Sequence, residues 1–499
     1  MLQTFGRWGI FAGGTLALCF SNSVNGNVLA AWLAPALLLV FVMTTRPWAG
    51  LGAMILAGAL GNAVMFHGAL PMADTEFAVF CLVTGLIGAV PYVMSRLAAP
   101  RLGVVSGSLV FPCLMTGLGF VSTETSPFGS WAHDAYMQLD VAPLAQVAAF
   151  VGLWGVAFPV YFSASVAAAV VTQWGRGAVM ALVLLASVTG GAFLAGTWRL
   201  QAPTVAGPML RVAAFGNPAG MPDRFFEGCA ARADTACRRS KAHERLDRLM
   251  AMTEESVRGG AKLVVWYEAA IQYDQAEEVA IVARVGEYAK SRGIYLVSGA
   301  AAIPGDPEAL MINKAQVYTP QGTLAFEYLK AMPVPGEPIV KGDGVIRMLD
   351  TPHGRLGVMI CFDADFPALA RQAAAKGVDL LAIPANDWRA ITPLHGHMTR
   401  FRAIENGFPV VRSTSNGLSI IADPRGSVLA AVNSFDQPGV PALADVPTSR
   451  IGTPYAVVGD SFAIASIITG LALLVLAAVS AIRDTIRTRS AGAAIGSHR

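Results

Sequence analysis

The first 200 residues are a succession of long apolar runs separated by short polar segments. A membrane-spanning helix needs about 20 mostly apolar residues. Seven runs fit this pattern, at 8–22, 28–44, 49–68, 77–95, 103–121, 143–171 and 178–196, and an eighth lies at 460–482. The first run has the alternative interpretation of a cleaved signal peptide, but no small-residue cleavage motif follows it. The pattern therefore predicts a helical membrane bundle of about seven helices at 1–200, and a last membrane helix with a cytoplasmic tail at 456–499.

The pattern changes between residues 201 and 455, where short β-branched runs alternate with amphipathic stretches. This alternation is typical of a layered α/β domain. The predicted helices cover 241–258, 276–292, 366–376 and 395–406. The predicted strands are Leu210–Phe215, Lys262–Tyr267, Ile294–Ser298, Asn313–Thr319, Leu356–Ile360, Leu380–Pro384 and Pro409–Ser413.

The composition of the chain agrees with one part in the membrane and one part in water. The chain is 54% hydrophobic and only 14% charged, which lies outside the norm for soluble proteins. Residues 1–200 hold six Arg, no Lys and five acidic residues, so most of the charge belongs to the α/β segment. The net charge of +3 comes without a basic run interleaved with aromatic residues, and nucleic-acid binding has no support.

The charges between the apolar runs predict an orientation. Short cytoplasmic loops are enriched in Lys and Arg, and one set of loops holds Arg7, Arg46, Arg96, Arg101 and Arg176. The opposite loops hold Asp74, Glu76, Glu124, Asp134 and Asp140. We therefore expect the α/β domain on the outer, periplasmic side of the cytoplasmic (inner) membrane, tethered at both ends. The long outer loop 122–142, with Phe128, Trp131 and Tyr136, is interpreted as an interfacial aromatic belt or as part of a lipid-entry rim.

The six cysteines include no CxxC pair and no Cys/His set at zinc spacing. Cys19, Cys81 and Cys113 lie in apolar runs and are interpreted as small buried hydrophobes. Cys229 and Cys237 lie eight residues apart in a polar stretch, and the sequence leaves open whether they form a disulfide. His395-Gly396-His397 has no acidic or Cys partner at a matching spacing, so we predict no metal site.

Three polar residues each follow an apolar run of the α/β segment. Glu268 follows Leu263–Tyr267, Lys330 follows 326–329 and precedes a Pro-rich loop, and Cys361 follows Gly357–Ile360. Taken alone, Glu268 and Lys330 are more often solvated strand ends, and Cys361 is as often a buried structural thiol. A thiol between a strand and a helix, however, meets backbone N–H groups that favour thiolate and can bind an oxyanion. The three together indicate a catalytic unit.

Residues 208–430 resemble the carbon–nitrogen hydrolase (nitrilase) superfamily. The matching text is Val265-Trp266-Tyr267-Glu268, Tyr328-Leu329-Lys330 with Pro335-Gly336-Glu337, and Ile360-Cys361-Phe362-Asp363. The layout of the whole chain resembles the membrane branch of that superfamily, the apolipoprotein N-acyltransferases, as do Asn386-Asp387-Trp388, 402–407, 415–417, Gly129-Ser130-Trp131 and Gly152-Leu153-Trp154-Gly155. The resemblance implies an αββα sandwich with the catalytic residues Glu268, Lys330 and Cys361.

The resemblance also implies a reaction. Cys361, with Glu268 as base, would take a fatty acyl group from a phospholipid and pass it from a thioester to an amine, in the family's case the N-terminal Cys of a lipoprotein. Lys330 and the backbone N–H of Phe362 would hold the oxyanion, and Glu337 would orient Lys330. Trp266 and Asp363 are further supporting candidates. The partners implied are a phospholipid donor, a lipoprotein or other amine acceptor and the membrane, without a cofactor.

The sequence departs from the family pattern at three places. Phe362-Asp363 stands where the family has Tyr-Glu after the nucleophile, Gln272 stands where it has Pro, and Asn217 stands where it has Gln near the first strand. These changes spare the triad and bear on the acceptor. Two alternatives stay open: a membrane-anchored amidase or nitrilase-like enzyme, including a conjugal-transfer type, and a catalytically silent lipid-binding or assembly protein, against which an intact triad argues.

Overall fold

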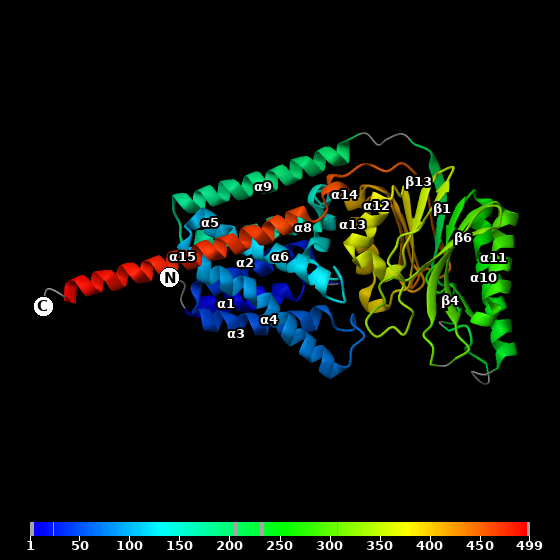
Figure 1. Ribbon diagram of the computed structural model, residues 1–499, viewed down its shortest axis with the longest axis horizontal. Coiled ribbons are helices and arrows are strands. Elements are labelled where there is room, and N and C mark those ends of the chain that lie inside the picture. The colour runs from blue at the N-terminus through cyan, green and yellow to red at the C-terminus, as the bar shows by residue number, and fades with distance from the viewer. Residues whose placement is uncertain are drawn as a thin grey trace. The chain divides into compact units, whose positions relative to one another are not determined.

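The chain forms two compact units in a computed structural model that describes residues 4–22, 24–202, 207–222, 224–229, 234–306 and 308–496 (Figure 1). The helical unit comprises the residues up to Thr125, Ala132–Gln201 and the residues from Val458 onward. The α/β unit comprises Ser126–Trp131 and Ala202–Val457. A short piece of the long outer loop therefore belongs with the α/β unit.

The helical unit is built from helices that match the predicted apolar runs. They are α1 (Thr4–Leu18), α2 (Val28–Thr44), α3 (Pro47–Met65), α4 (Asp74–Ala98), α5 (Val104–Ser108), α6 (Val110–Thr125), α7 (Ala142–Ala145), α8 (Ala148–Thr172), α9 (Arg176–Gln201) and α15 (Ser461–Gly496), with 3-10 turns η1 (Ala99–Arg101) and η2 (Asp134–Asp140).

Six helical segments of the described chain are long and apolar enough to cross a membrane: Pro47–Met65, Asp74–Arg101, Val104–Thr125, Ala148–Thr172, Arg176–Gln201 and Ser461–Thr488. They confirm the predicted membrane bundle and indicate a membrane protein. The first two predicted spans form helices of only 15 and 17 residues. The second is short because Asn27 caps its start and Thr45 ends it two residues before Pro47, which begins α3.

Small residues allow close packing inside the helical unit. A Cβ atom on Gly58 of α3 would lie 2.7 Å from the Cα of Gly85 in α4, a distance that real Cβ atoms do not reach. Apolar lipid tails give no hydrophobic drive for helix association, so tight packing through small residues is the main source of stability there. The α3–α4 pair packs in this way.

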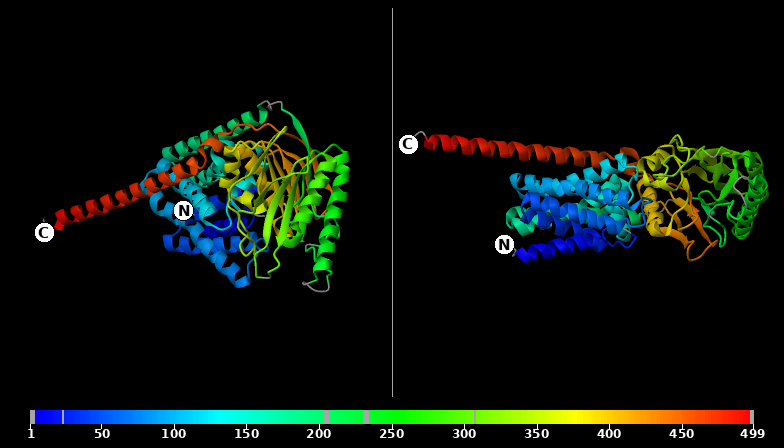
Figure 2. Two further views of the ribbon diagram at one scale, coloured as in Figure 1. Left: turned by 45° about the vertical axis from the view of Figure 1, so that its right-hand side comes forward. Right: turned by 90° about the horizontal axis from the view of Figure 1, so that it is seen from below.

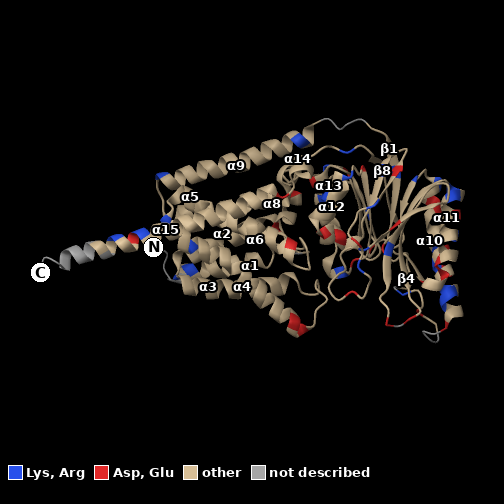
Figure 3. Ribbon diagram, viewed as in Figure 1, with Lys and Arg blue, Asp and Glu red and all other residues tan. Residues whose placement is uncertain are grey.

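The charges of the helical unit are separated by end, as Figure 3 shows. Basic residues lie where α4 ends and α9 begins, and acidic residues lie where α4 begins and α6 ends. Arg199, in the last turn of α9, is an exception, and its guanidinium donates to Gln146. This distribution is the one from which the orientation was predicted, and the orientation itself stays a prediction.

The α/β unit contains two sheets of antiparallel and parallel strands. The strands of the first are β1 (Met209–Phe215), β2 (Leu263–Val265), β3 (Ile271–Asp274), β4 (Tyr295–Ile303), β5 (Ile312–Tyr318), β6 (Leu324–Leu329) and β13 (Pro441–Pro447). Their order is β13-β1-β2-β4-β5-β6, with β3 paired to β4. The second sheet has the order β12-β11-β10-β9-β8-β7, from β7 (Met348–Thr351), β8 (Gly354–Val358), β9 (Leu380–Ala385), β10 (Val410–Thr414), β11 (Leu418–Ala422) and β12 (Val428–Asn433).

Four layers result, and the views in Figure 2 show the same order as Figure 1. Helices α10 (Thr235–Arg258) and α11 (Glu278–Arg292) cover the first sheet, and α12 (Pro367–Ala375) and α13 (Leu394–Asn406) lie on the second, with the short α14 (Pro454–Val458) beyond. One core fills the space between the sheets, where Val265 and Val297 meet Val358, Ile383 and Val411. A second core joins the first sheet to α10 and α11. The predicted αββα sandwich is confirmed.

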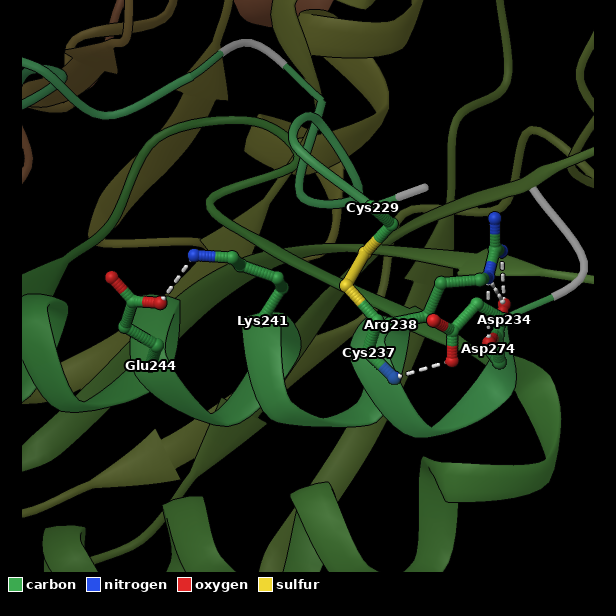
Figure 4. The surroundings of a disulfide bond; sticks show 7 residues. All are labelled: Cys229, Asp234, Cys237, Arg238, Lys241, Glu244 and Asp274. Carbon is green, nitrogen blue, oxygen red and sulfur yellow. Dashed lines mark hydrogen bonds and ion pairs between the residues drawn. A yellow bond between two sulfur atoms is a disulfide. The ribbon is translucent and has the colours of Figure 1, made fainter. Parts of the chain in front are cut away.

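Cys229 and Cys237 form a disulfide beside the start of α10 (Figure 4), which answers the question that the sequence left open. Asp234 caps this helix by accepting from the Cys237 N–H at 3.0 Å. Next to the bridge, Arg238 donates from Nε to Asp274 at the end of β3, at 2.9 Å. The bridge thus fastens the segment before α10 to the outer side of the first sheet.

Candidate functional site

The three predicted catalytic residues lie just after strands, at facing ends of the two sheets. Glu268 follows β2, Lys330 follows β6, and Cys361 opens the 3-10 turn η4 (Cys361–Asp365) after β8. The backbone N–H of Glu268 donates to the carbonyl of Ala385 on β9, at 3.2 Å. Strand ends of the first sheet therefore meet strand ends of the second at this place.

Lys330 is held between two glutamates. Its Nζ lies 2.9 Å from Glu268 Oε1 and 2.8 Å from Glu337 Oε2, and its side chain is only 2% exposed. Burial alone would lower the pKa of Lys330, but the negative charge of Glu268, with Cys361 and Glu337 in support, outweighs it and raises this pKa. Lys330 is therefore a fixed cation at neutral pH.

Asn313 is a member of this group that the sequence analysis missed. Its Nδ2 donates to Glu268 Oε1 at 2.7 Å, and its carbonyl accepts from the Lys330 N–H at 3.0 Å. The β5–β6 hairpin pairs Lys314 with Leu329, so one step further puts Asn313 opposite Lys330. Counting back from the Gln321-Gly322 turn was the signal in the sequence that could have found it.

The backbone around the site is strained at two residues. Cys361 has a φ of 48° and Ala269, next to Glu268, has a φ of 52°, a region that residues with a side chain rarely adopt. Gly299 of β4 lies so close that a Cβ there would be 2.6 Å from the Cα of Glu268. Position 299 therefore requires glycine, because any side chain would push Glu268 out of place.

Cys361 is a buried thiol within electrostatic range of both other residues. Its Sγ lies 3.5 Å from the carbonyl oxygen of Asn386 and is oriented to donate to it. Burial, and then the charge of Glu268, raise the pKa of Cys361 well above its ordinary value, while Lys330 and Arg412 lower it. The resting group is a thiol, and it needs a base before it can act as a nucleophile.

Asp363, a predicted supporting residue, fixes the turn that carries Cys361. Its carboxylate accepts from Tyr328 Oη at 2.8 Å and from the N–H groups of Ile360 and Met332 at 2.9 and 2.7 Å. Burial raises the pKa of Asp363 to about 6 against the pull of these donors. The three bonds join the turn to β6 and to the loop after Lys330.

The other two supporting candidates lie differently. Phe362 is buried in the turn and packs edge to face on Phe366. Trp266 points into the core below α10, where its Nε1 donates to Thr253 at 2.9 Å and its ring stacks on Tyr288. We interpret Trp266 as a packing residue of the outer core.

A second buried charge cluster lies on the other side of the thiol. Asp387 Oδ1 lies 2.7 Å from His395 Nδ1 and 2.7 Å from Arg412 Nη2, and His395 Nε2 lies 3.2 Å from Asp365 Oδ1. One atom each of Cys361, Asp387 and His395 falls within 4.8 Å of the other two. The sequence analysis considered His395 only as a metal ligand and did not connect it with Asp387 or Asp365.

The sequence shows no acidic or thiol partner of His395 at a matching spacing, and the structure supplies such neighbours from distant segments instead. These three groups do not favour a metal ion. Arg412, with its fixed positive charge, donates to the same Asp387 oxygen that a metal would use, and Nε2 of His395 already faces Asp365. A metal ion there would compete with Arg412 for Asp387 and would lie beside its fixed positive charge.

Residues 126–131 of the long outer loop pack on this cluster. Ser130 donates from its N–H and its Oγ to the carbonyl of Asp365, at 2.8 and 2.6 Å. The ring of Trp131 meets His395 edge to face at 5.5 Å between centroids. Tyr136, in contrast, is buried in the helical unit. The aromatic residues of this loop therefore do not form one exposed belt.

Comparison with known proteins gives consistent results. Residues 229–453 match the model of the carbon–nitrogen hydrolase family. The chain is 28% identical over 366 residues to an apolipoprotein N-acyltransferase from Geobacter metallireducens, covering 67% of each chain. It is 26% identical over 461 residues to one from Bradyrhizobium diazoefficiens, covering 83% of this chain and 80% of the relative. The matched region thus spans about two thirds or more of the length of these relatives.

The α/β unit by itself also has relatives. Over 210 residues the chain is 30% identical to a nitrilase from Pyrococcus abyssi, covering 37% of this chain and 78% of the nitrilase. An amidase from Nesterenkonia sp. aligns in structure over 49% of this chain and 93% of the amidase, with 22% identity and a TM-score of 0.39.

Proposed function

The chain belongs to the carbon–nitrogen hydrolase family, and from that premise we propose that it is a membrane N-acyltransferase that uses Cys361, Lys330 and Glu268. It would move a fatty acyl group from a phospholipid to an amine, the N-terminal Cys of a lipoprotein. The observation that carries the proposal is the buried Glu268–Lys330–Glu337 group beside a buried thiol, on a chain with six candidate membrane helices.

In the first half-reaction Glu268 takes the proton of Cys361, and the thiolate attacks the ester carbonyl of a phospholipid. A bond forms between Sγ and the carbonyl carbon, and the bond from that carbon to the alcohol oxygen breaks. The proton on Glu268 passes to the leaving lysophospholipid. The fixed charge of Lys330, with the N–H of Phe362, stabilises the oxyanion in between, and Glu337 and Asn313 hold Lys330 and Glu268 in place.

In the second half-reaction an amine attacks the thioester. The bond between nitrogen and the acyl carbon forms and the bond to Sγ breaks, while Glu268 accepts the proton of the amine and returns it to sulfur. The cycle needs no oxidant or reductant, because no atom changes its oxidation state, and the proposal includes no cofactor. The similarity to apolipoprotein N-acyltransferases, which extends into the helical unit, supports a lipid donor and a lipoprotein acceptor.

The side of the membrane is part of the proposal. The α/β unit would lie on the periplasmic side of the inner membrane, and the tail after residue 482 in the cytoplasm. Two observations support this: the separation of basic from acidic residues along the helical unit and the disulfide in the α/β unit, since disulfides persist in oxidising compartments. Alkaline phosphatase fused near residue 205 should be active, and near residue 490 it should be inactive. Activity at both positions would exclude the two-ended tether.

The intermediate tests the donor. Purified protein incubated with phospholipid alone should gain the mass of one acyl chain on Cys361, and neutral hydroxylamine should remove it. The Cys361→Ala protein gives the background. Active protein that never carries an acyl adduct would exclude phospholipid as the donor.

The acceptor is tested separately, by rescue of a bacterial strain depleted of its own apolipoprotein N-acyltransferase. Rescue by the wild-type chain, and not by Cys361→Ala, is the expected result. A chain that takes up the acyl group from phospholipid but does not rescue growth would keep the donor and require another amine.

A membrane-anchored amidase is the second candidate, favoured by the 30% identity over 210 residues to a nitrilase. An amidase of this kind would be acylated by small amides, and water would then hydrolyse the thioester and release the acid. Release of ammonia from short amides, with no lipid adduct, would identify it.

A further inference from the structure

His395 is a buried histidine whose two ring nitrogens both face carboxylates. Nδ1 lies 2.7 Å from Asp387 Oδ1 and Nε2 lies 3.2 Å from Asp365 Oδ1, and none of the three side chains is more than 3% exposed. Arg412 Nη2 also lies near Nδ1, at 2.9 Å, and could donate to it in a neutral ring. Such a ring, however, would place the Nδ1 lone pair 2.7 Å from the Asp387 oxygen, whereas an imidazolium donates to both carboxylates. The two carboxylate contacts therefore favour the protonated ring, and Arg412 opposes it.

The charges of the cluster point the same way. Arg412, fully buried, donates to Asp387 at 2.7 Å. Asp365 and Asp387 carry two negative charges, so the four groups sum to zero only when His395 is positive. Burial and Arg412 oppose a charged ring, but the two carboxylates outweigh them and raise the pKa of His395 to about 9. The edge contact with Trp131 adds an aromatic neighbour to the ring.

The cluster is adjacent to the thiol through both of its carboxylates. Asp365 ends the same short turn that Cys361 begins. Asp387 follows Asn386, whose carbonyl lies 3.5 Å from Cys361 Sγ. A ring nitrogen of His395, an oxygen of Asp387 and the sulfur all lie within 4.8 Å of one another. A change in the net charge of this cluster must therefore act on the cost of forming the thiolate.

We propose that His395 is a positioning residue for Cys361: its positive charge balances Asp365 and Asp387, so that the thiolate forms beside a neutral cluster instead of a negative one. This inference rests on the proposed function only in taking Cys361 as the nucleophile. It does not depend on which acyl donor or acceptor the protein uses.

The test measures the rate at which iodoacetamide alkylates Cys361 in the purified full-length protein at pH 7.5, read on the peptide that contains Cys361 by mass spectrometry. His395→Gln keeps a polar side chain but leaves the cluster with one negative charge in excess. We expect its alkylation rate to fall by roughly 10- to 100-fold, because one added charge at this distance acts at a low effective dielectric constant. His397→Gln, two residues along the same helix and partly exposed, should stay within about twofold of wild type.

Two further variants separate charge from packing. Asp365→Asn leaves one positive charge in excess, so Cys361 should alkylate faster than in wild type. The double variant His395→Gln with Asp365→Asn restores neutrality and should recover most of the lost rate. A merely structural role predicts the opposite, namely that Asp365→Asn slows the reaction and the double variant is worse than either single one. That result, or an unchanged rate in His395→Gln, would overturn the inference.

The variants also distinguish a failure of this inference from a failure of the proposed function. If His395→Gln does not fold, Asp365→Asn alone still decides the sign of the effect. If wild type takes up no acyl group from phospholipid while the alkylation rates follow the expected order, the proposed function is wrong and the role of His395 stands.

Discussion

Two buried ionic clusters meet at Cys361, and they differ in origin and in charge. The first, Glu268–Lys330–Glu337, comes from strand ends of the first sheet and the loop after Lys330, and it carries one negative charge in excess. The second, made of Asp365, Asp387, His395 and Arg412, comes from the second sheet and its helix α13, and it is neutral when His395 is protonated.

This difference in charge suits the two clusters to different roles at Cys361. A thiol whose pKa is raised by burial needs a base, and in the proposed mechanism Glu268 of the first cluster is that base. A second excess negative charge on the other side of the sulfur would oppose the thiolate. Because the second cluster is neutral, its two carboxylates can lie next to Cys361 without raising the free energy of the thiolate.

A third buried group shows that the pattern of charges alone does not make a site. Lys314 of β5 is also buried between two glutamates, with its Nζ 2.5 Å from Glu278 and 2.8 Å from Glu327. Yet neither Lys314 nor these glutamates are among the charges that act on Cys361. What distinguishes the first cluster is the thiol that it faces.

The largest expected effect comes from removing the sulfur at which the two clusters meet. Cys361→Ala should reduce acyl transfer to background, because no other group can form the thioester. The protein should remain folded, since only one buried sulfur atom is lost. Cys113→Ala removes another buried thiol, from the helical unit, and should keep nearly full transfer. Measurable transfer by Cys361→Ala would show that the reaction does not pass through this residue.

The next largest effect concerns the first cluster. Lys330→Ala and Glu268→Gln should each lower kcat/KM by about 10²- to 10⁴-fold, the range for a lost oxyanion partner or general base. The double variant should be little worse than either single one, because the residues act as a unit.

Lys314→Ala is the matched control for that experiment. It removes a similarly buried lysine that also lies between two glutamates, and it should destabilise the protein, but kcat/KM of the folded fraction should stay near that of wild type. Equal losses of kcat/KM in Lys314→Ala and Lys330→Ala would mean that the effect is one of folding, and the comparison of the clusters would fail.

The sequence made the first cluster predictable and the second not. Glu268 and Cys361 each follow an apolar run that was predicted as a strand, and Lys330 follows 326–329, so the place of these residues can be inferred locally although β6 itself was not predicted. The second cluster combines four segments that meet only because β8, β9 and β10 are parallel neighbours. One local signal was present: Arg412 interrupts the run Val410–Thr414, and a charge inside a buried strand needs a partner.

The prediction of the strands from the sequence has the same limit. The seven predicted strands all exist, because each is buried on both faces or nearly so, and their ends shift by at most five residues. Strands such as β6, β7, β12 and β13 were missed because they are partly exposed and their apolar positions are interrupted. β3 was missed because it has only four residues and pairs only with β4.

A smaller effect, on stability, sharpens the account of the second cluster. The pKa of His395 is about 9 in the folded protein, against roughly 6.5 when unfolded. Because the folded value is the higher one, the stabilisation is complete below about pH 6.5 and is lost as the pH rises through 9, and it amounts to roughly 3 kcal/mol.

Thermal unfolding of wild type and His395→Gln between pH 6 and 10 measures this effect. The difference in Tm between the two proteins should be largest at the acid end and shrink above pH 9. A difference in Tm that stays constant over this range would mean that His395 is not charged in the folded protein.

The smallest effect on the thiol is expected from the disulfide, which lies beside the start of α10, while the charges that act on Cys361 belong to other segments. Changing both Cys229 and Cys237 to Ser should cost about 2 to 3 kcal/mol, as expected for a bridge that closes a short loop. The Arg238–Asp274 pair beside the bridge should limit the loss of order. The alkylation rate of Cys361 should remain within about twofold of wild type, because no charge near the sulfur changes. A large drop in that rate would show that the outer side of the first sheet also controls the thiol, contrary to the division between the two inner clusters.

Blocking free thiols in intact cells before purification adds a second readout for the disulfide. Cys229 and Cys237 should escape modification if the α/β unit faces an oxidising compartment, and their modification would contradict the proposed side of the membrane.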